Sequence, residues 1–266
     1  KPAYVILYGL VGSERWIRDR YTYNKTGQGL TASTSDAENG ETVTLTVTYT
    51  GTDYLGNSYN STTLPVNAAA SYTATVTLDG SYANYKLKST AVLTKTFEIK
   101  KKTISAVFGI TAADKQYDGA NTATLDWSAA TFGSDVCAGD ELVVSGATGT
   151  FTNKAIGANK VVNISGITVA SKNGDNAHLN YELTAGYTTS HTGAEISRRV
   201  ITVTWSGDKS ADGKILMKFD GTAKLPTATA GNLVDGETLT LTVSAVGAAA
   251  INPGDYKAQA AFARGA

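Results

Sequence analysis

The residues best suited to chemistry are few and lie far apart in the sequence. The chain of 266 residues has two histidines, His178 and His191, and one cysteine, Cys137. Protein zinc sites use several histidine or cysteine ligands at short spacings, and the sequence has no HExxH motif and too few cysteines for CxxC. A nucleophilic cysteine needs a nearby base. We therefore expect no zinc site, an incidental thiol, and histidines in loops or on strand faces.

Acidic and amide residues gather in two short stretches that could bind a cation. They are Asp135, Asp140 and Glu141 in one stretch, and Asp175, Asn176 and Asn180 in the other. Calcium prefers several oxygen ligands from one loop, but neither stretch has the spacing of an EF-hand. We interpret both as ordinary turns and predict no metal and no cofactor, with structural calcium as the alternative.

Other catalytic motifs are missing from the sequence as well. It contains no GxSxG, no GxGxxG and no phosphate-binding loop. We predict that the chain is not an enzyme, because a hydrolase would need a cluster of catalytic residues that the sequence does not display. Lysines and asparagines are plentiful, so a Lys–Asn isopeptide cross-link beside a buried acid is a further alternative, although no motif fixes the pair.

Three tryptophans raise the question of carbohydrate binding, because exposed aromatic faces can stack on sugars. Trp205 ends the alternating stretch 200–205, which favours a core position. Trp16 lies among charged residues and is the best exposed candidate, whereas Trp127 suits either role. Trp16 and Trp127 are therefore the candidate ligand-binding residues.

The charge balance argues against nucleic acid or an anionic membrane as a partner. Lys and Arg total 23 and Asp and Glu total 23, whereas both partners require clustered positive charge. The most apolar run, residues 3–12, is about half of the ~20 residues that a helix needs to span a bilayer. We predict no direct membrane insertion. The ends do not resemble natural termini, so we expect a segment of a longer protein.

The composition is typical of β-structure. Threonine and tyrosine are abundant, and β-branched and aromatic residues favour strands. No window of a dozen residues shows a helical apolar period, so the sequence predicts an all-β fold. Pairs that tolerate tight turns recur along the chain, at Asn39-Gly40, Asp79-Gly80, Asp118-Gly119, Asp212-Gly213, Asp220-Gly221 and Asp235-Gly236.

One stretch occurs twice. Residues 40–47 are GETVTLTV, and residues 236–243, 196 positions later, are GETLTLTV. Alternation of apolar residues and threonines predicts a strand in each copy, with one face in the core and one in water.

The match extends beyond this stretch. Tyr23 and Phe219 each lie 17 residues before the glycine that begins it. Residues 5–9 also correspond to 203–207, and residues 66–76 to 251–261. Matching segments in the same order across separate strands indicate duplication of a whole module.

Two further similarities mark the module boundaries. NYKL (84–87) leads to FEIKKKTI (97–104), and NYEL (180–183) leads to AEISRRVI (194–201). We therefore predict modules at 1–102, 103–199 and 200–266. The basic linkers, Lys100 to Lys102 and Arg198 to Arg199, are short, so we expect an extended rod. We interpret the basic residues as solvated joints, with an anion site as the alternative.

The middle module carries motifs that resemble a known family. They are KQYDGANTA (115–123), AGDELVVSGATGTF (138–151), NKAIGANKVVNISGITV (153–169) and LNYELTA (179–185). In this order they closely resemble the YDG module of large bacterial surface proteins, which takes its name from the Tyr117-Asp118-Gly119 type of motif. The flanking copies, with FDGTAKLPTA (219–228), DGETLTLTV (235–243) and NPGDYKA (252–258), resemble the bacterial Ig-like MBG modules that accompany it.

These resemblances imply three tandem Ig-like β-sandwiches in an elongated array. They also imply a non-catalytic stalk segment of an extracellular, adhesin-like bacterial surface protein. Its partners would be neighbouring modules of a longer chain and a host or matrix glycan or protein. A carbohydrate- or protein-binding module is the alternative function. The first copy departs from the pattern, with Tyr23-Asn24-Lys25 in place of Phe219-Asp220-Gly221.

The third copy is incomplete in sequence, because it has no counterpart of NYKL or FEIKK. A sandwich that lacks its last strand exposes a sheet edge. We expect either that the strand lies outside this segment or that a neighbouring chain supplies it by strand addition.

Overall fold

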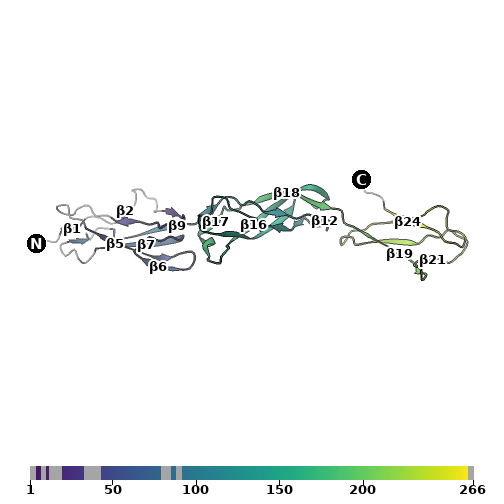
Figure 1. Ribbon diagram of the computed structural model, residues 1–266, viewed down its shortest axis with the longest axis horizontal. Coiled ribbons are helices and arrows are strands. Elements are labelled where there is room, and N and C mark those ends of the chain that lie inside the picture. The colour runs from purple at the N-terminus through teal and green to yellow at the C-terminus, as the bar shows by residue number, and fades with distance from the viewer. Residues whose placement is uncertain are drawn as a thin grey trace. The chain divides into compact units, whose positions relative to one another are not determined.

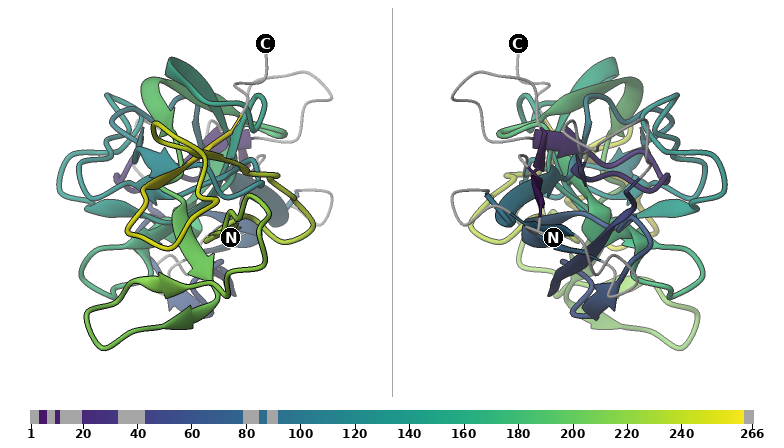
Figure 2. Two further views of the ribbon diagram at one scale, coloured as in Figure 1. Left: turned by 90° about the vertical axis from the view of Figure 1, so that its right-hand side faces the viewer. Right: turned by 90° about the vertical axis from the view of Figure 1, so that its left-hand side faces the viewer.

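The computed structural model describes residues 4–6, 10–11, 20–32, 43–78, 85–87 and 92–262. Regular structure in these residues consists of β-strands and one short 3-10 helix, η2 (Ala177–Asn180). The ribbon accordingly shows arrows and loops in every view (Figures 1 and 2). The all-β prediction is confirmed. In the described part of the chain, no helix is long and apolar enough to cross a membrane.

The first region forms a five-stranded sheet with the order β3-β9-β7-β5-β6, and two small sheets, β1-β8 and β2-β4. Its strands are β1 (Tyr4–Ile6), β2 (Leu10–Val11), β3 (Arg20–Thr22), β4 (Thr31–Ala32), β5 (Leu45–Thr52), β6 (Ser58–Ser61), β7 (Ala69–Leu78), β8 (Tyr85–Leu87) and β9 (Thr94–Lys100). Strand β9 pairs antiparallel with β7 and parallel with β3. It therefore joins the two halves of the sheet.

The core of this region follows from alternation along the strands. In β9, Phe97 and Ile99 are buried, whereas Thr96 before them and Lys100 after them are exposed and Glu98 between them is half-buried. Tyr72 on β7 is also buried, and its ring centroid lies 5.6 Å from that of Phe97. Side chains of one face thus meet across neighbouring strands, which is the main source of sheet stability.

The middle region contributes a second five-stranded sheet, with the order β12-β18-β16-β15-β13, and the small sheets β10-β17 and β11-β14. Its strands are β10 (Lys102–Ile104), β11 (Thr111–Ala112), β12 (Lys115–Gln116), β13 (Thr122–Ala123), β14 (Leu125–Asp126), β15 (Leu142–Phe151), β16 (Gly157–Ser171), β17 (Tyr181–Leu183) and β18 (Thr189–Ser197).

The last region has only two-stranded sheets: β19-β22, β20-β21 and β23-β24. Its strands are β19 (Thr202–Ser206), β20 (Asp208–Lys209), β21 (Ile215–Leu216), β22 (Thr227–Gly231), β23 (Thr242–Ala245) and β24 (Ala258–Ala261). Within the described residues, every buried hydrophobic side chain lies between Tyr23 and Ile196. The last region therefore has no closed core of its own among these residues.

The strands predicted from the repeat begin later than expected. Strand β5 begins at Leu45 and β23 at Thr242, although the faces alternate as predicted from Leu239 to Ala245. Continuing the β23–β24 register would pair residues 239–241 with 262–264, and the described residues end at 262. Residues 40–42 of the first copy lie outside the described part.

Contacts divide the chain into two compact units. Unit 1 comprises Lys1–Ala112, Ala123–Thr150 and Val162–His191, and unit 2 comprises Ala113–Thr122, Phe151–Val161 and Thr192–Ala266. We describe each unit by itself. The module boundaries at 102 and 199, the Ig-like class and the rod remain predictions.

Candidate functional site: two tyrosine–carboxylate clusters

Three short motifs of the chain adopt the same turn. They are Tyr23-Asn24-Lys25, Tyr117-Asp118-Gly119 and Phe219-Asp220-Gly221. In each, a side-chain oxygen of the middle residue accepts a hydrogen bond from the backbone N–H two residues later, at 2.9, 3.0 and 3.0 Å. The third residue is left-handed in each, with φ of 65, 78 and 79°. The first copy thus departs in sequence but keeps the turn.

The strand before each motif fixes where its aromatic residue lies. Tyr23 donates its backbone N–H to the carbonyl of Lys100 at 2.8 Å, and Tyr117 donates to Ser197 at 2.9 Å. These carbonyls end β9 and β18, which pair in parallel with β3 and β12. Each tyrosine is therefore held at the end of a five-stranded sheet, next to a predicted linker.

In unit 1, Tyr23 belongs to a polar group around a buried carboxylate that we name the Asp140 cluster: Tyr23, Lys25, Asp140 and Tyr181. Asp140 Oδ2 accepts hydrogen bonds from the hydroxyls of Tyr23 at 2.8 Å and Tyr181 at 2.7 Å. Its Oδ1 lies 2.7 Å from Lys25 Nζ, and its side chain is only 5% exposed. All three donors to the carboxylate come from residues far away in the sequence.

Burial and hydrogen bonding act in opposite directions on Asp140. Burial alone raises the pKa of its carboxyl, but hydrogen bonds from Lys25, Tyr181 and Tyr23 outweigh it and hold the pKa below the usual value. The pKa values of Tyr23 and Tyr181 are raised, first by burial and then by the hydrogen bond to Asp140. The cluster thus favours an ionised acid and neutral tyrosines.

A chain of amide hydrogen bonds extends the contact beside this cluster. The buried Asn180 accepts from the backbone N–H of Ala68 at 2.8 Å and donates to Asn67 Oδ1 at 3.3 Å. Asn67 in turn donates to Asp53 Oδ2 at 2.7 Å. Among the described residues, no buried side-chain polar atom lacks a partner. The predicted first and middle modules are thus joined by a satisfied polar network.

In unit 2, Tyr117 belongs to a second group, the Glu237 cluster: Tyr117, Arg199, Asn232 and Glu237. The Tyr117 hydroxyl donates to Glu237 Oε1 at 2.5 Å. Arg199 donates from Nε to the Asn232 carbonyl at 2.6 Å and from Nη2 to Asn232 Oδ1 at 2.8 Å. Arg199 is half-buried, and its guanidinium fork fits these two acceptors. The interpretation of the basic linkers as solvated joints stays a prediction.

The two clusters share one geometry around the acid. Asp140 donates its N–H to the carbonyl of Cys137 at 3.0 Å, and Glu237 donates to Val234 at 2.9 Å. The preceding glycines, Gly139 and Gly236, have φ of 86 and 83°. In both cases a tight turn with a left-handed glycine presents the following acid to a tyrosine at the end of the preceding sheet.

The geometry of both clusters depends on the middle region. Residues 100–192 match the YDG domain. No curated protein and no solved structure matched the chain. The YDG domain supplies Asp140 and Tyr181 to one cluster and Tyr117 to the other, whereas Arg199 and Glu237 follow it in the sequence. The resemblance predicted for the middle third is therefore confirmed.

The glycine of the YDG motif has a packing role. A Cβ added to Gly119 would lie 2.6 Å from Val234 Cγ1, whereas one added to Gly221 would meet nothing within 4 Å. Both glycines have nearly the same positive φ, so alanine at either site pays about 1 kcal/mol of backbone strain.

We expect Gly119→Ala to lower the free energy of unfolding by about 2 kcal/mol or more, and Gly221→Ala by about 1 kcal/mol. Urea denaturation of the whole chain measures both variants. Equal losses would mean that Val234 moves aside at no cost.

The tryptophan candidates take no part in these clusters. Trp16 lies outside the described residues. Trp127 is half-buried at the start of a turn, and its carbonyl accepts from the N–H of Ala130 at 3.0 Å. Its role in ligand binding stays a prediction. Trp205 is half-buried and lines a groove in the last region.

The acidic stretches do not assemble into one site. Asp135 accepts from the N–H and Oγ of Ser105, both at 2.7 Å, and Glu141 lies 3.7 Å from Lys172 Nζ. Asp175 accepts from the N–H of Ala177 at 3.0 Å. Within the described ranges, no three His, Cys, Asp or Glu residues come together as metal ligands.

The histidines and the cysteine lie apart. His178 Nδ1 is 3.1 Å from Ser171 Oγ, and His191 lies on β18. Cys137 forms no disulfide, and its Sγ lies 3.7 Å from Lys102 Nζ.

Sequence reasoning missed the partners of Asp140. Tyr23, Lys25 and Tyr181 are 117, 115 and 41 residues away from it. One signal was present: the motif that departs from the repeat, Tyr23-Asn24-Lys25, has the hydroxyl and the cation that Phe219 and Gly221 lack. A second was the common Gly-acid pair before the strands at 142 and 242.

Proposed function

We propose that this chain is a non-catalytic stalk segment of a bacterial, extracellular, adhesin-like surface protein that spaces or presents a binding region. The observation that carries the proposal is the repeated tyrosine–carboxylate contact. The Tyr23–Asp140 and Tyr117–Glu237 bonds each fasten the end of a sheet in one predicted module to a turn inside the next predicted module. A stalk needs such joints because a freely jointed chain does not hold a fixed spacing.

The chemistry of the clusters supports a mechanical role over a catalytic one. The Asp140 carboxylate accepts from three donors and its side chain is only 5% exposed, so it is poorly accessible to a substrate. The likeness of the flanking segments to MBG modules, in FDGTAKLPTA (219–228) and NPGDYKA (252–258), fits the same surface-protein context.

A protein- or carbohydrate-binding module is the second candidate. It is favoured by the open groove of the last region, which is lined by Trp205, Phe219 and Tyr256. The two functions are compatible in one protein, because the groove and the tyrosine–carboxylate contacts involve different residues.

Small-angle scattering and a glycan array on the same preparation test the proposal. We expect a narrow, concentration-independent distance distribution typical of an elongated particle, and no glycan signal. Tyr117→Phe together with Asp140→Asn should broaden the distribution by loosening both joints. A compact particle, or a distribution that the double variant leaves unchanged, would contradict the stalk. A glycan signal lost in Trp127→Ala would favour the binding module.

A further inference from the structure

The last region contains an open apolar groove. Its cavity has a volume of about 680 Å³ and is lined by Met217, Phe219, Ala245, Ile251 and Tyr256, among others. Of the fifteen large hydrophobic residues that are exposed in the described part of the chain, ten lie between Val200 and Phe262. The groove therefore exposes side chains that a closed module would bury.

The first copy of the repeat shows what occupies the equivalent place. There, the rings of Tyr21, Tyr49 and Tyr72 surround Phe97 of β9, with centroid distances of 5.7, 6.1 and 5.6 Å. The 196-residue offset places Met217 at the position of Tyr21 and Ala245 at that of Tyr49.

The strand registers identify the third counterpart. Val47 pairs with Val76 in the first copy, and its equivalent Val243 pairs with Ala260. Counting back four residues on each partner strand makes Tyr256 the equivalent of Tyr72. The three residues that would surround an incoming phenylalanine thus all line the groove.

The exposed fractions agree with a missing strand. Tyr72 is 1% exposed and Tyr23 is 3% exposed, whereas their equivalents Tyr256 and Phe219 are 44% and 56% exposed. Strand β9 lies between β7 and β3, and among the described strands β24, the equivalent of β7, pairs only with β23. The position of β3 corresponds to residues 216–218, of which Leu216 ends β21 and residues 217 and 218 are not in a strand.

The outer edge of β24 is also set up to donate backbone hydrogen bonds. Lys257 accepts from the N–H of Val246 on the β23 side, so alternation directs the N–H groups of Ala258 and Ala260 to the other edge. In the first copy, Val76 at the position of Ala260 donates its N–H to Leu93, just before β9, at 2.8 Å.

We propose that this groove binds a β-strand that lies outside the described residues, in which an aromatic and an aliphatic residue at alternate positions are flanked by carboxylates. The strand would add antiparallel to β24, place its aromatic residue against Met217, Ala245 and Tyr256, and so complete the core. This inference does not rest on the stalk function.

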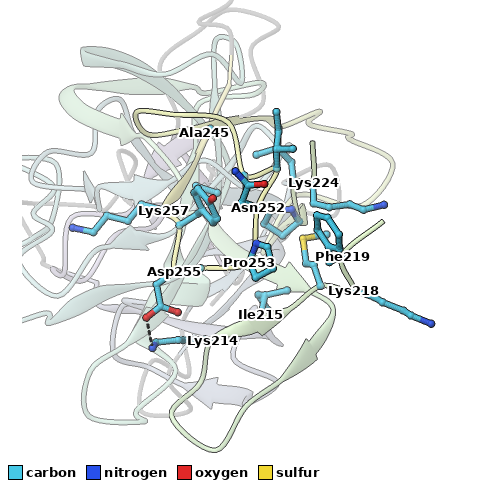
Figure 3. A pocket seen from close by; sticks show the side chains of 18 of the residues that line it. Lys214, Ile215, Lys218, Phe219, Lys224, Ala245, Asn252, Pro253, Asp255 and Lys257 are labelled. Carbon is cyan, nitrogen blue, oxygen red and sulfur yellow. Dashed lines mark hydrogen bonds and ion pairs between the residues drawn. The ribbon is translucent and has the colours of Figure 1, made fainter. Parts of the chain in front are cut away.

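Charge complementarity defines the flanking residues. Four lysines and one aspartate line the groove, and Lys257 extends from one side while Lys218 and Lys224 extend from the other (Figure 3). Lys257 is the equivalent of Thr73, which pairs with Thr96 in the β7–β9 register. Lys218 is the equivalent of Thr22, which pairs with Lys100 in the β3–β9 register. Acids at these two positions suit the groove, because opposite charges across a strand pair attract.

A labelled peptide with the sequence of residues 92–101, VLTKTFEIKK, provides the probe for the whole chain in solution. We expect the peptide with Thr96→Glu and Lys100→Glu to bind in a fluorescence anisotropy titration, and the unmodified peptide to bind severalfold more weakly. Adding Phe97→Ser and Ile99→Ser should weaken binding about tenfold or more. In hydrogen exchange, bound peptide should slow the amides of Ala258 and Ala260.

Two phenylalanines give a matched pair of chain variants. Phe219→Glu places a charge in the groove and should abolish binding, whereas Phe262→Glu, also at an exposed phenylalanine but outside the lining, should not. Lys257→Glu should weaken binding of the Thr96→Glu peptide severalfold.

Three outcomes would overturn the proposal. They are no binding of the acidic peptide, equal binding of the Phe97→Ser, Ile99→Ser peptide, and loss of binding in Phe262→Glu as well as Phe219→Glu. Self-association of the chain through the groove, detected by light scattering and abolished by Phe219→Glu, would identify a second copy as the occupant instead.

Discussion

Replacing Phe97 with alanine is expected to lower the free energy of unfolding of the first region by about 3–5 kcal/mol. Phe97 is 2% exposed and its ring contacts those of Tyr21, Tyr49 and Tyr72. Truncation removes this burial and leaves a cavity under three aromatic rings, which cannot collapse because their backbones are held in paired strands.

Phe108→Ala is the control for this prediction. Phe108 is 57% exposed, and its backbone forms the bridge to Thr131, which alanine retains. We expect a change within about 0.5 kcal/mol. Urea denaturation followed by hydrogen exchange assigns each transition to its residues. Equal effects of the two replacements would mean that β9 contributes little to the first core, and would also weaken the case for a missing strand in the last region.

The sequence predicted the parts of the fold that depend on local pattern. Alternation in 239–245 predicted which side chains face inward, and the Asp118-Gly119 pair predicted a turn. The motifs at 115–123 and 138–151 predicted the YDG domain. Strand beginnings were predicted less well, because strand pairing is not a local property of the sequence.

The candidate site was not predicted, because its contacts join distant residues. Asp140 was grouped with Asp135 and Glu141, its neighbours in sequence, yet each of the three carboxylates has different partners. Position in the chain cannot show that Asp140 faces a tyrosine 117 residues away. The Gly-acid turn before a strand, repeated at 139–140 and 236–237, was the available clue.

The substitutions within the repeat follow a single physical logic. The first copy has Tyr23 and Lys25, which supply a hydroxyl and a cation to Asp140. The third copy has Phe219 and Gly221, which can supply neither, and Phe219 is exposed at a groove instead. The two copies of the repeat thus share one turn and differ in the side chains that it presents.

The Asp140→Ala variant should show how much the Asp140 cluster contributes to stability. The variant removes the acceptor of two buried tyrosine hydroxyls and the partner of Lys25. We expect the free energy of unfolding of unit 1 to fall by about 3 kcal/mol, because buried donors left without partners are costly. Asp140→Asn keeps an acceptor oxygen and should cost less.

The pH dependence of the stability of unit 1 shows how much the charge of Asp140 contributes. Because its folded pKa is lowered, its stabilisation is present above the unfolded value of about 3.9 and is lost as the pH falls through the folded pKa. The raised pKa values of Tyr23 and Tyr181 act in the other direction. Their contribution is present below about pH 10 and is lost as the pH rises further.

Stability of unit 1 should therefore be highest between about pH 4 and pH 10, and Asp140→Asn should flatten the acid side of the profile. Glu182→Gln is the matched control: it removes one carboxylate charge next to Tyr181, but Glu182 is exposed on β17. Thermal denaturation across this pH range measures both variants. If Glu182→Gln flattened the acid side as much as Asp140→Asn, the effect would come from net charge, and the joint would not depend on the buried carboxylate.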